Sequence, residues 1–165
     1  MEPGDIFKKR NLSKVNFEYE ELIGRNLSNT NLTEVNLRDR DIHNADFSGA
    51  DLSGADLTNT ILFNVKLRGA NLQNAKLVNA KLWDTDMYGV NLTNVNISGA
   101  DLFYADLRNA DLRNTNLSSV NLRHTNFDGA IFTSVDFTNA NYDLDTLSTI
   151  SKDIKLILQM QGKLW

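Results

Sequence analysis

Large apolar residues recur at every fifth position along most of the chain. From Leu12 to Tyr142, each of these positions carries Leu, Ile, Phe, Met or Tyr, in 27 consecutive instances without a change of register. A helix turns about 100° per residue and a strand alternates its faces with a period of two, so a spacing of five fits neither element. The pattern therefore indicates a repeating coil built from five-residue units.

The positions before each large residue are restricted as well. Two residues before it, 23 of the 27 positions hold Ala, Val or Thr, and one residue before it, 21 of the 27 hold Asn or Asp. Asn, Asp and Gly suit corners because they tolerate unusual backbone angles, and Asn and Asp also hydrogen-bond to nearby backbone groups. The sequence thus predicts a solenoid in which the large and small residues point inward and the residues flanking each large residue point outward.

A second period of twenty residues indicates four sides per coil. Large rings recur at this spacing at Phe63, Trp83 and Phe103, and one column of glycines does the same. We expect about seven coils that pair their backbones at roughly 4.8 Å.

Two runs carry a family resemblance. GADLSGADL at residues 49–57 and YADLRNADL at residues 104–112 resemble the pentapeptide repeat family, whose A(D/N)LXX pattern covers residues 12–142. The resemblance implies an all-β solenoid, a right-handed quadrilateral β-helix. It implies little about function, because most members of that family have none assigned.

The chain divides into three expected segments. Residues 1–11 form an N-terminal lead-in and cap, residues 12–143 form the β-helix, and residues 144–165 form a C-terminal α-helix that caps the last coil or mediates dimerisation. In this last segment the period changes to that of a helix, with Gly162 as its stop. Its core-facing side chains are expected to be Leu147, Ile150, Ile154, Ile157 and Leu158.

A second apolar flank of this helix comprises Leu156, Met160 and Leu164. A cap needs only one apolar face, so the second flank leaves open a homodimer through the helix. The alternative is a monomer whose tail folds over more of the rod.

Composition removes most catalytic and metal chemistry from consideration. The chain has no cysteine, a single proline at Pro3 and a net charge of −4, which argues against broad binding to nucleic acid. His43 and His124 lie about four coils apart, roughly 19 Å at the coil spacing. We therefore expect no catalytic residue, no metal site, no cofactor and no enzyme activity. No apolar run has the length of a signal peptide or membrane span, so we expect a cytoplasmic protein without a membrane partner.

One outward column is rich in aromatic residues. Its members and neighbours are the candidate partner-binding residues Phe63, Trp83, Phe103, Tyr88, Tyr104 and Ile61, with Tyr88 on the next side. We expect the first three to form a vertical ladder of rings. The ladder could stabilise adjacent coils, as cross-strand pairs do, or it could bind a partner through an exposed apolar patch.

These observations favour a non-enzymatic scaffold that binds a protein partner through a flat side of the rod. The resemblance suggests an alternative, because some members of the family mimic duplex DNA and occupy the DNA site of type II topoisomerases. Basic residues interrupt the carboxylates of this chain, and it lacks the loop insertion that some of those members carry. A structural spacer is the third hypothesis. The family is abundant in cyanobacteria, so by association we expect a bacterial, cyanobacterial source.

Overall fold

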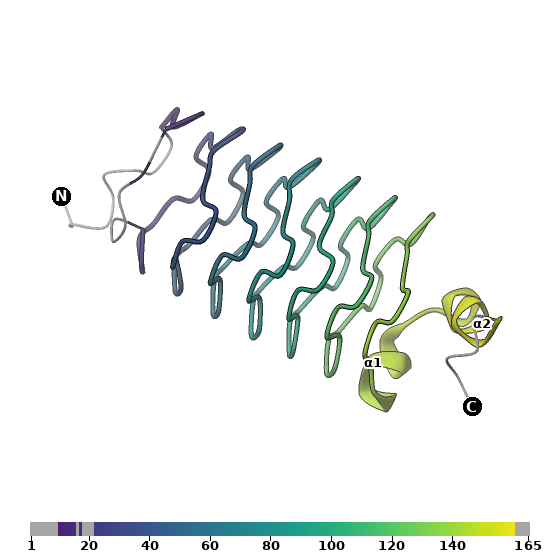
Figure 1. The fold of residues 1–165 in the computed structure, drawn as a ribbon. Coiled ribbons are helices and arrows are strands. Elements are labelled where there is room, and N and C mark those ends of the chain that lie inside the picture. The colour runs from purple at the N-terminus through teal and green to yellow at the C-terminus, as the bar shows by residue number, and fades with distance from the viewer. Residues whose placement is uncertain (1–9, 16, 18–21, 161–165) are drawn as a thin grey trace.

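The chain winds into an elongated rod with two short helices at its C-terminal end (Figure 1). The computed structural model describes residues 10–15, 17 and 22–160 of the 165 residues. Parallel backbone bridges join residues twenty apart, from Asn11 and Asn31 at one end to Asn121 and Asn141 at the other. One coil therefore contains four pentapeptides, which confirms the four-sided coil predicted from the sequence.

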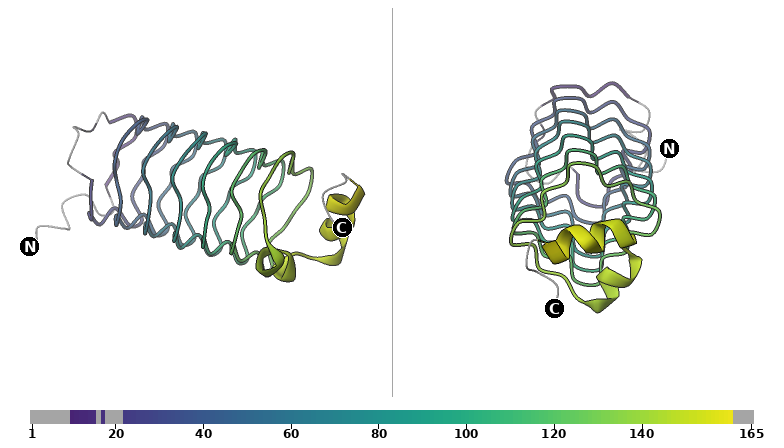
Figure 2. Two further views of the ribbon diagram at one scale, coloured as in Figure 1. Left: turned by 60° about the horizontal axis from the view of Figure 1, so that its bottom comes forward. Right: turned by 90° about the vertical axis from the view of Figure 1, so that its right-hand side faces the viewer.

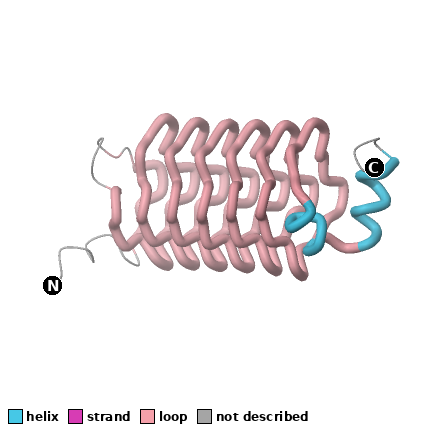
Figure 3. Tube along the Cα trace, turned by 90° about the horizontal axis from the view of Figure 1, so that it is seen from below, coloured by secondary structure: helices cyan, strands magenta, loops and turns pink. Residues whose placement is uncertain are grey.

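Each side of a coil pairs through one residue and then turns. The N–H of Leu102 donates to the carbonyl of Asn121 in the next coil at 2.9 Å, and the N–H of Ala105 closes a turn on the carbonyl of Leu102 at 2.9 Å. Because a turn follows every bridge, the described residues form isolated bridges and no continuous strand (Figure 3).

The corners have left-handed backbone conformations. Gly89 has φ +65°, and in the same column Asn109 has φ 57°. Tyr104 and His124 hold corner positions with φ 59° and 58°, although they are much bulkier than the Asn and Gly typical of such positions. These two exceptions lie on one side of the rod, where they bring additional rings to the surface.

The core is a single cluster of inward side chains that extends along the rod. Leu72, Leu92 and Leu112 are fully buried, and Ala or Val fills most of the small positions. Where Thr replaces them, its hydroxyl is satisfied: Thr115 Oγ1 donates to the carbonyl of Leu92 at 2.9 Å. Burial of each large side chain contributes about 1.5–3 kcal/mol before chain entropy is subtracted.

The C-terminal segment forms two helices, α1 (Leu144–Thr149) and α2 (Lys152–Met160). The prediction of one continuous helix is therefore wrong: the chain is extended at Ile150, with φ −82° and ψ 141°. The last coil holds the end of α1, because the N–H of Phe127 donates to Thr149 Oγ1 at 3.0 Å while the Thr149 hydroxyl donates to the carbonyl of Thr146 at 2.8 Å.

Helix α2 lies across the C-terminal end of the rod (Figure 2). Ile150, Ile154 and Leu158 are buried in the core cluster and Leu147 packs against it, whereas the side chain of Ile157, all of Gly162 and residues 1–9 fall outside the description. Neither helix is long and apolar enough to cross a membrane, within the residues that the structure describes.

Candidate functional site

The side of the rod whose inward stack contains Leu62, Leu82 and Leu102 carries the predicted aromatic column. The residue after each inward leucine points outward, and these residues are Phe63, Trp83 and Phe103. We call this side the aromatic face and define it by the residues that it gathers: His43, Ile61, Phe63, Trp83, Phe103, Tyr104 and His124. Of the six candidate binding residues, only Tyr88 lies on a different side.

Three rings of the aromatic face form a parallel stack. His43 and Phe63 have ring centroids 4.5 Å apart with 9° between their planes, and Phe63 and Trp83 are 4.5 Å apart at 8°. The winding of the coil produces this stack, because it places residues twenty apart one coil spacing from each other. The Nδ1 of His43 is hydrogen-bonded to the carboxylate of Asp41 at 2.7 Å, which orients its ring.

The predicted ladder is wrong at Phe103. Among the described residues no ring contact joins Trp83 to Phe103, whose ring instead packs edge-on against Tyr104 at 4.6 Å and against His124 at 5.5 Å. Tyr104 stacks on His124 at 4.6 Å. Phe103 thus belongs to a second ring cluster with the two corner residues, and His43 supplies the third ring of the stack.

The aromatic face leaves much of its apolar surface in water. Trp83 is 40% exposed, Tyr104 55% and Ile61 37%, and Ile23 continues the same column with 37%. An exposed apolar strip of this kind is typical of an interaction surface.

Charged groups border Trp83. Asp84 follows it at the exposed corner, and Lys81 is two residues before it on the opposite flank. Lys81 forms a backbone bridge with Asp101 of the next coil, whose carboxylate accepts the N–H of Phe103 at 3.2 Å and the amide of Asn121 at 2.8 Å. Within the described part of the chain, Asp84 takes part in no ion pair.

Tyr88 belongs to a separate cluster on the neighbouring side. The guanidinium of Arg68 lies 4.6 Å from the centre of its ring and that of Arg108 lies 5.7 Å away. Arg68 pairs with Asp86 at 3.1 Å and Arg108 with Asp106 at 2.7 Å. The hydrogen bond from Arg108 lowers the pKa of Asp106, and the same contact raises the pKa of Arg108. These arginines and carboxylates are satisfied by one another.

A histidine–carboxylate cluster that was not predicted from the sequence joins α1 to the coils. One ligand-type atom each of His124, Asp143 and Asp145 lies within 4.8 Å of the others. Asp143 caps α1 by accepting the N–H of Thr146 at 2.9 Å and also accepts the N–H of His124 at 3.1 Å, while His124 Nδ1 lies 2.9 Å from Asp145. The twenty-residue period was the available signal, because it places residues 143 and 144 one coil after 123 and 124.

These interactions identify the cluster as an anchor for α1. Burial acts to raise the pKa of Asp143, but the hydrogen bonds from Thr146 and His124 outweigh it and hold that pKa below its usual range. The side chain of His124 contacts both carboxylates, so the cluster is a structural contact between the last coil and α1.

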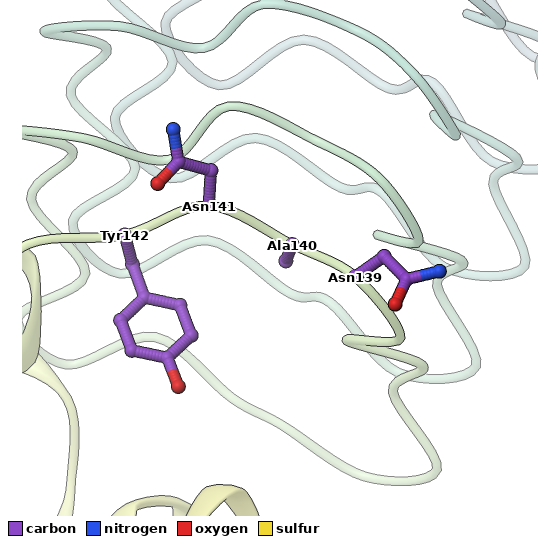
Figure 4. Close-up of a pocket in the computed structure, with 4 residues that line it drawn as sticks. All are labelled: Asn139, Ala140, Asn141 and Tyr142. Carbon is purple, nitrogen blue, oxygen red and sulfur yellow. The ribbon is translucent and has the colours of Figure 1, made fainter. Parts of the chain in front are cut away.

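A cavity of about 340 Å³ opens at the C-terminal end of the rod. It is lined by Asn139, Ala140, Asn141 and Tyr142, with the Tyr142 ring and the Asn141 amide on opposite sides of the chain (Figure 4). Partial burial raises the pKa of the Tyr142 phenol. The lining offers amides and a protonated phenol at neutral pH, and therefore no nucleophile or base.

The predicted dimer flank is only partly described. Leu156 on α2 is 57% exposed. The side chain of Met160 and the whole of Leu164 lie outside the description. Homodimerisation through this flank stays a prediction.

A family model described as pentapeptide repeats matches the chain in 8 copies, over residues 11–54, 41–77, 70–107 and 105–141. Comparison of the sequence with curated proteins finds no significant match.

Several solved structures are similar to the chain. The pentapeptide repeat protein Rfr23 from the cyanobacterium Cyanothece is 26% identical, with 73% of this chain and 88% of that one covered and a TM-score of 0.32. HetL from the cyanobacterium Nostoc, described as involved in heterocyst differentiation regulation, is 24% identical over 81% of this chain and 77% of that one, with a TM-score of 0.32. QnrB1, described as a plasmid-mediated fluoroquinolone resistance protein, is 14% identical over 93% of this chain and 97% of that one, with a TM-score of 0.38.

Proposed function

The chain belongs to the pentapeptide repeat family, and from this premise we propose that it is a non-enzymatic scaffold that binds a protein partner through its aromatic face. Proteins of this family fold as right-handed quadrilateral β-helices, a rigid architecture that presents flat sides. Such a side can display several side chains in fixed positions, so binding costs little ordering entropy.

The gathering of exposed apolar residues on one side carries this proposal. Ile23, Ile61, Trp83 and Tyr104 all lie on or beside the aromatic column and are all at least 37% exposed. Aromatic residues at the centre of an interface contribute a large share of binding energy. A purely stabilising ladder would not need the isoleucines beside it.

The charge distribution supports a scaffold over a DNA mimic. A mimic needs a continuous negative surface, whereas here the carboxylates of Asp106 and Asp111 are each neutralised by the arginine two residues later, at 2.7 Å and 2.5 Å. In a gyrase supercoiling assay we expect no inhibition at any concentration of the purified protein. Inhibition that weakens with added salt would favour mimicry.

We also propose that helices α1 and α2 cap a rod of about seven coils. The bridged segment from Asn11 to Asn141, at twenty residues per coil, supports the number of coils. Burial of Ile154 and Leu158 in the core cluster supports the role of α2 as a cap. Such a cap hides an edge that would otherwise pair with other chains.

The scaffold proposal is tested by quantitative affinity capture with two matched variants. Ile61→Ser removes an exposed apolar side chain from the aromatic face, and Ile131→Ser removes one that is 50% exposed on a different side. We expect Ile61→Ser, and more strongly Trp83→Ser, to lose the partner that wild type and Ile131→Ser retain. Circular dichroism verifies that each variant is folded. Equal capture by all variants would show that the aromatic face is not the interface, and would favour a passive spacer.

A further inference from the structure

The ring stack of the aromatic face ends at Trp83. One face of its indole is covered by Phe63 at 4.5 Å, and the next ring of the column, Phe103, makes no ring contact with it in the described structure. Trp83 is 40% exposed, the highest value among the rings of the column proper. The stack therefore ends at Trp83, although the twenty-residue period places a further ring, Phe103, in the next coil.

The ring contacts of Phe103 are with two corner residues and not with Trp83, within the part of the chain that the structure describes. Its ring packs edge-on against Tyr104 and His124, and Tyr104 stacks on His124 with 12° between the planes. His124 is fixed in turn by its 2.9 Å contact with Asp145 at the start of α1. Trp83 itself remains 40% exposed, so a ligand from outside can reach its indole.

We propose that the aromatic face recognises an arginine side chain of the partner, whose guanidinium stacks on the second face of Trp83. This inference rests on the proposed function, since it names the chemistry by which the same face engages a protein. A guanidinium is planar, so it continues the stack at the 4.5 Å separation that the three rings already show. Tryptophan is the ring on which a cation stacks best.

The charges beside Trp83 favour a cationic ligand. The exposed carboxylate of Asp84 is adjacent in sequence and takes part in no ion pair within the described residues, and Asp101 lies in the next coil. Lys81, two residues before Trp83, is on the opposite flank beside Asp101, its bridge partner. Lys81 and Asp101 offset each other's charge on that flank, so the carboxylate of Asp84 leaves a net negative charge beside Trp83.

The protein uses the same chemistry internally on the neighbouring side. There the Arg68 guanidinium lies 4.6 Å from the centre of the Tyr88 ring while it binds the carboxylate of Asp86 at 3.1 Å. A ring and a nearby carboxylate together hold a guanidinium in that cluster. Trp83 and Asp84 offer the same two kinds of group, a ring and a carboxylate, and no arginine stacks on this ring among the described residues.

Short peptides test the inference directly. Acetyl-Gly-Arg-Gly-amide is titrated into the full protein and the indole N–H signal of Trp83 is followed by NMR, after a Trp165→Phe variant has identified the other indole. We expect a saturable shift with the arginine peptide, and binding at least several-fold weaker with the lysine counterpart, because an ammonium is not planar and is more strongly hydrated.

Variants separate the two components of the site. Asp84→Asn should weaken the arginine peptide about two- to fivefold, which is the range for an exposed ion pair. Asp128→Asn, which changes an exposed carboxylate on another side, should leave it unchanged. Trp83→Phe should retain weaker binding and Trp83→Leu should abolish it, with backbone amide signals near residue 84 as the readout.

The outcomes distinguish this inference from the proposed function. Equal binding of arginine and lysine peptides, tighter binding of a phenylalanine peptide, or no effect of Asp84→Asn would overturn the arginine inference. If capture of the partner still depended on Trp83 in those cases, the scaffold function would stand. If no partner depended on Trp83 or Ile61, the scaffold function itself would fail, whatever the peptides did.

Discussion

The stacked rings of the aromatic face should stabilise the rod in addition to offering a surface to a partner. The test is a double-mutant cycle in which Phe63 and Trp83 are replaced by leucine singly and together. Leucine keeps apolar bulk at each position and removes the ring, so the coupling energy of the cycle reports the stacking interaction. The sequence left open whether the column stabilises coils or binds a partner, and this cycle measures the first role.

The structure sets the expected size of the coupling. The two centroids are 4.5 Å apart with 8° between the planes, a geometry in which an aromatic pair contributes about 0.5–1.5 kcal/mol beyond the area that it buries. In a domain of this length each kcal/mol corresponds to a shift in Tm of roughly 2–4 °C. The coupling should therefore appear as about 1–6 °C of non-additivity among the four proteins.

Urea unfolding followed by circular dichroism gives the four free energies. A control cycle on Phe63 and Phe103, which lie two coils apart, should be additive within about 0.5 kcal/mol. Additivity in the Phe63–Trp83 cycle, or equal coupling in both cycles, would refute the argument that the stack stabilises adjacent coils.

Three further predictions concern a corner, a helix cap and the oligomeric state. Gly89→Ala should destabilise the protein by roughly 0.5–1 kcal/mol in urea unfolding. The new Cβ would meet no atom within 4 Å, so the only cost is the left-handed backbone conformation at φ +65°, about 1–2 kcal/mol, which is partly offset by a stiffer unfolded chain. Gly89→Asn should cost less, and an equal loss of unfolding free energy in the two variants would contradict this reasoning. Asp143→Ala should cost about 0.5–2 kcal/mol at pH 7 through loss of the cap on α1. The pKa of Asp143 is lowered in the folded protein, so its contribution to stability is fully present above the ordinary carboxyl pKa of about 3.9 and is lost as the pH falls through the lower pKa of the folded state. The Tm difference between wild type and Asp143→Ala should therefore shrink in acid. Sedimentation should show a dimer that Leu156→Glu converts to a monomer, since Leu156 is 57% exposed on the predicted flank; a monomeric wild type would exclude that interface.

The sequence alone determined the coil. A period of five with a register of twenty predicts four sides per coil with every large residue pointing inward, and backbone bridges between residues such as Asp101 and Asn121 follow that register. The same register placed Phe63, Trp83 and Phe103 in one outward column. Periodicity was sufficient because inward or outward direction is a local property of each pentapeptide.

Only the tertiary structure decided which rings touch. Phe103 could stack on Trp83 or pack against Tyr104 and His124, and the register permits both; the outcome depends on side-chain rotamers and on contacts from the next coil. The break between α1 and α2 has the same kind of cause. The helical pattern is continuous in sequence, but the backbone N–H of Phe127 binds the Thr149 hydroxyl and the chain becomes extended at Ile150. Both the ring contacts of Phe103 and the break between the helices depend on competition between contacts from distant parts of the chain, and a local repeat does not encode that competition.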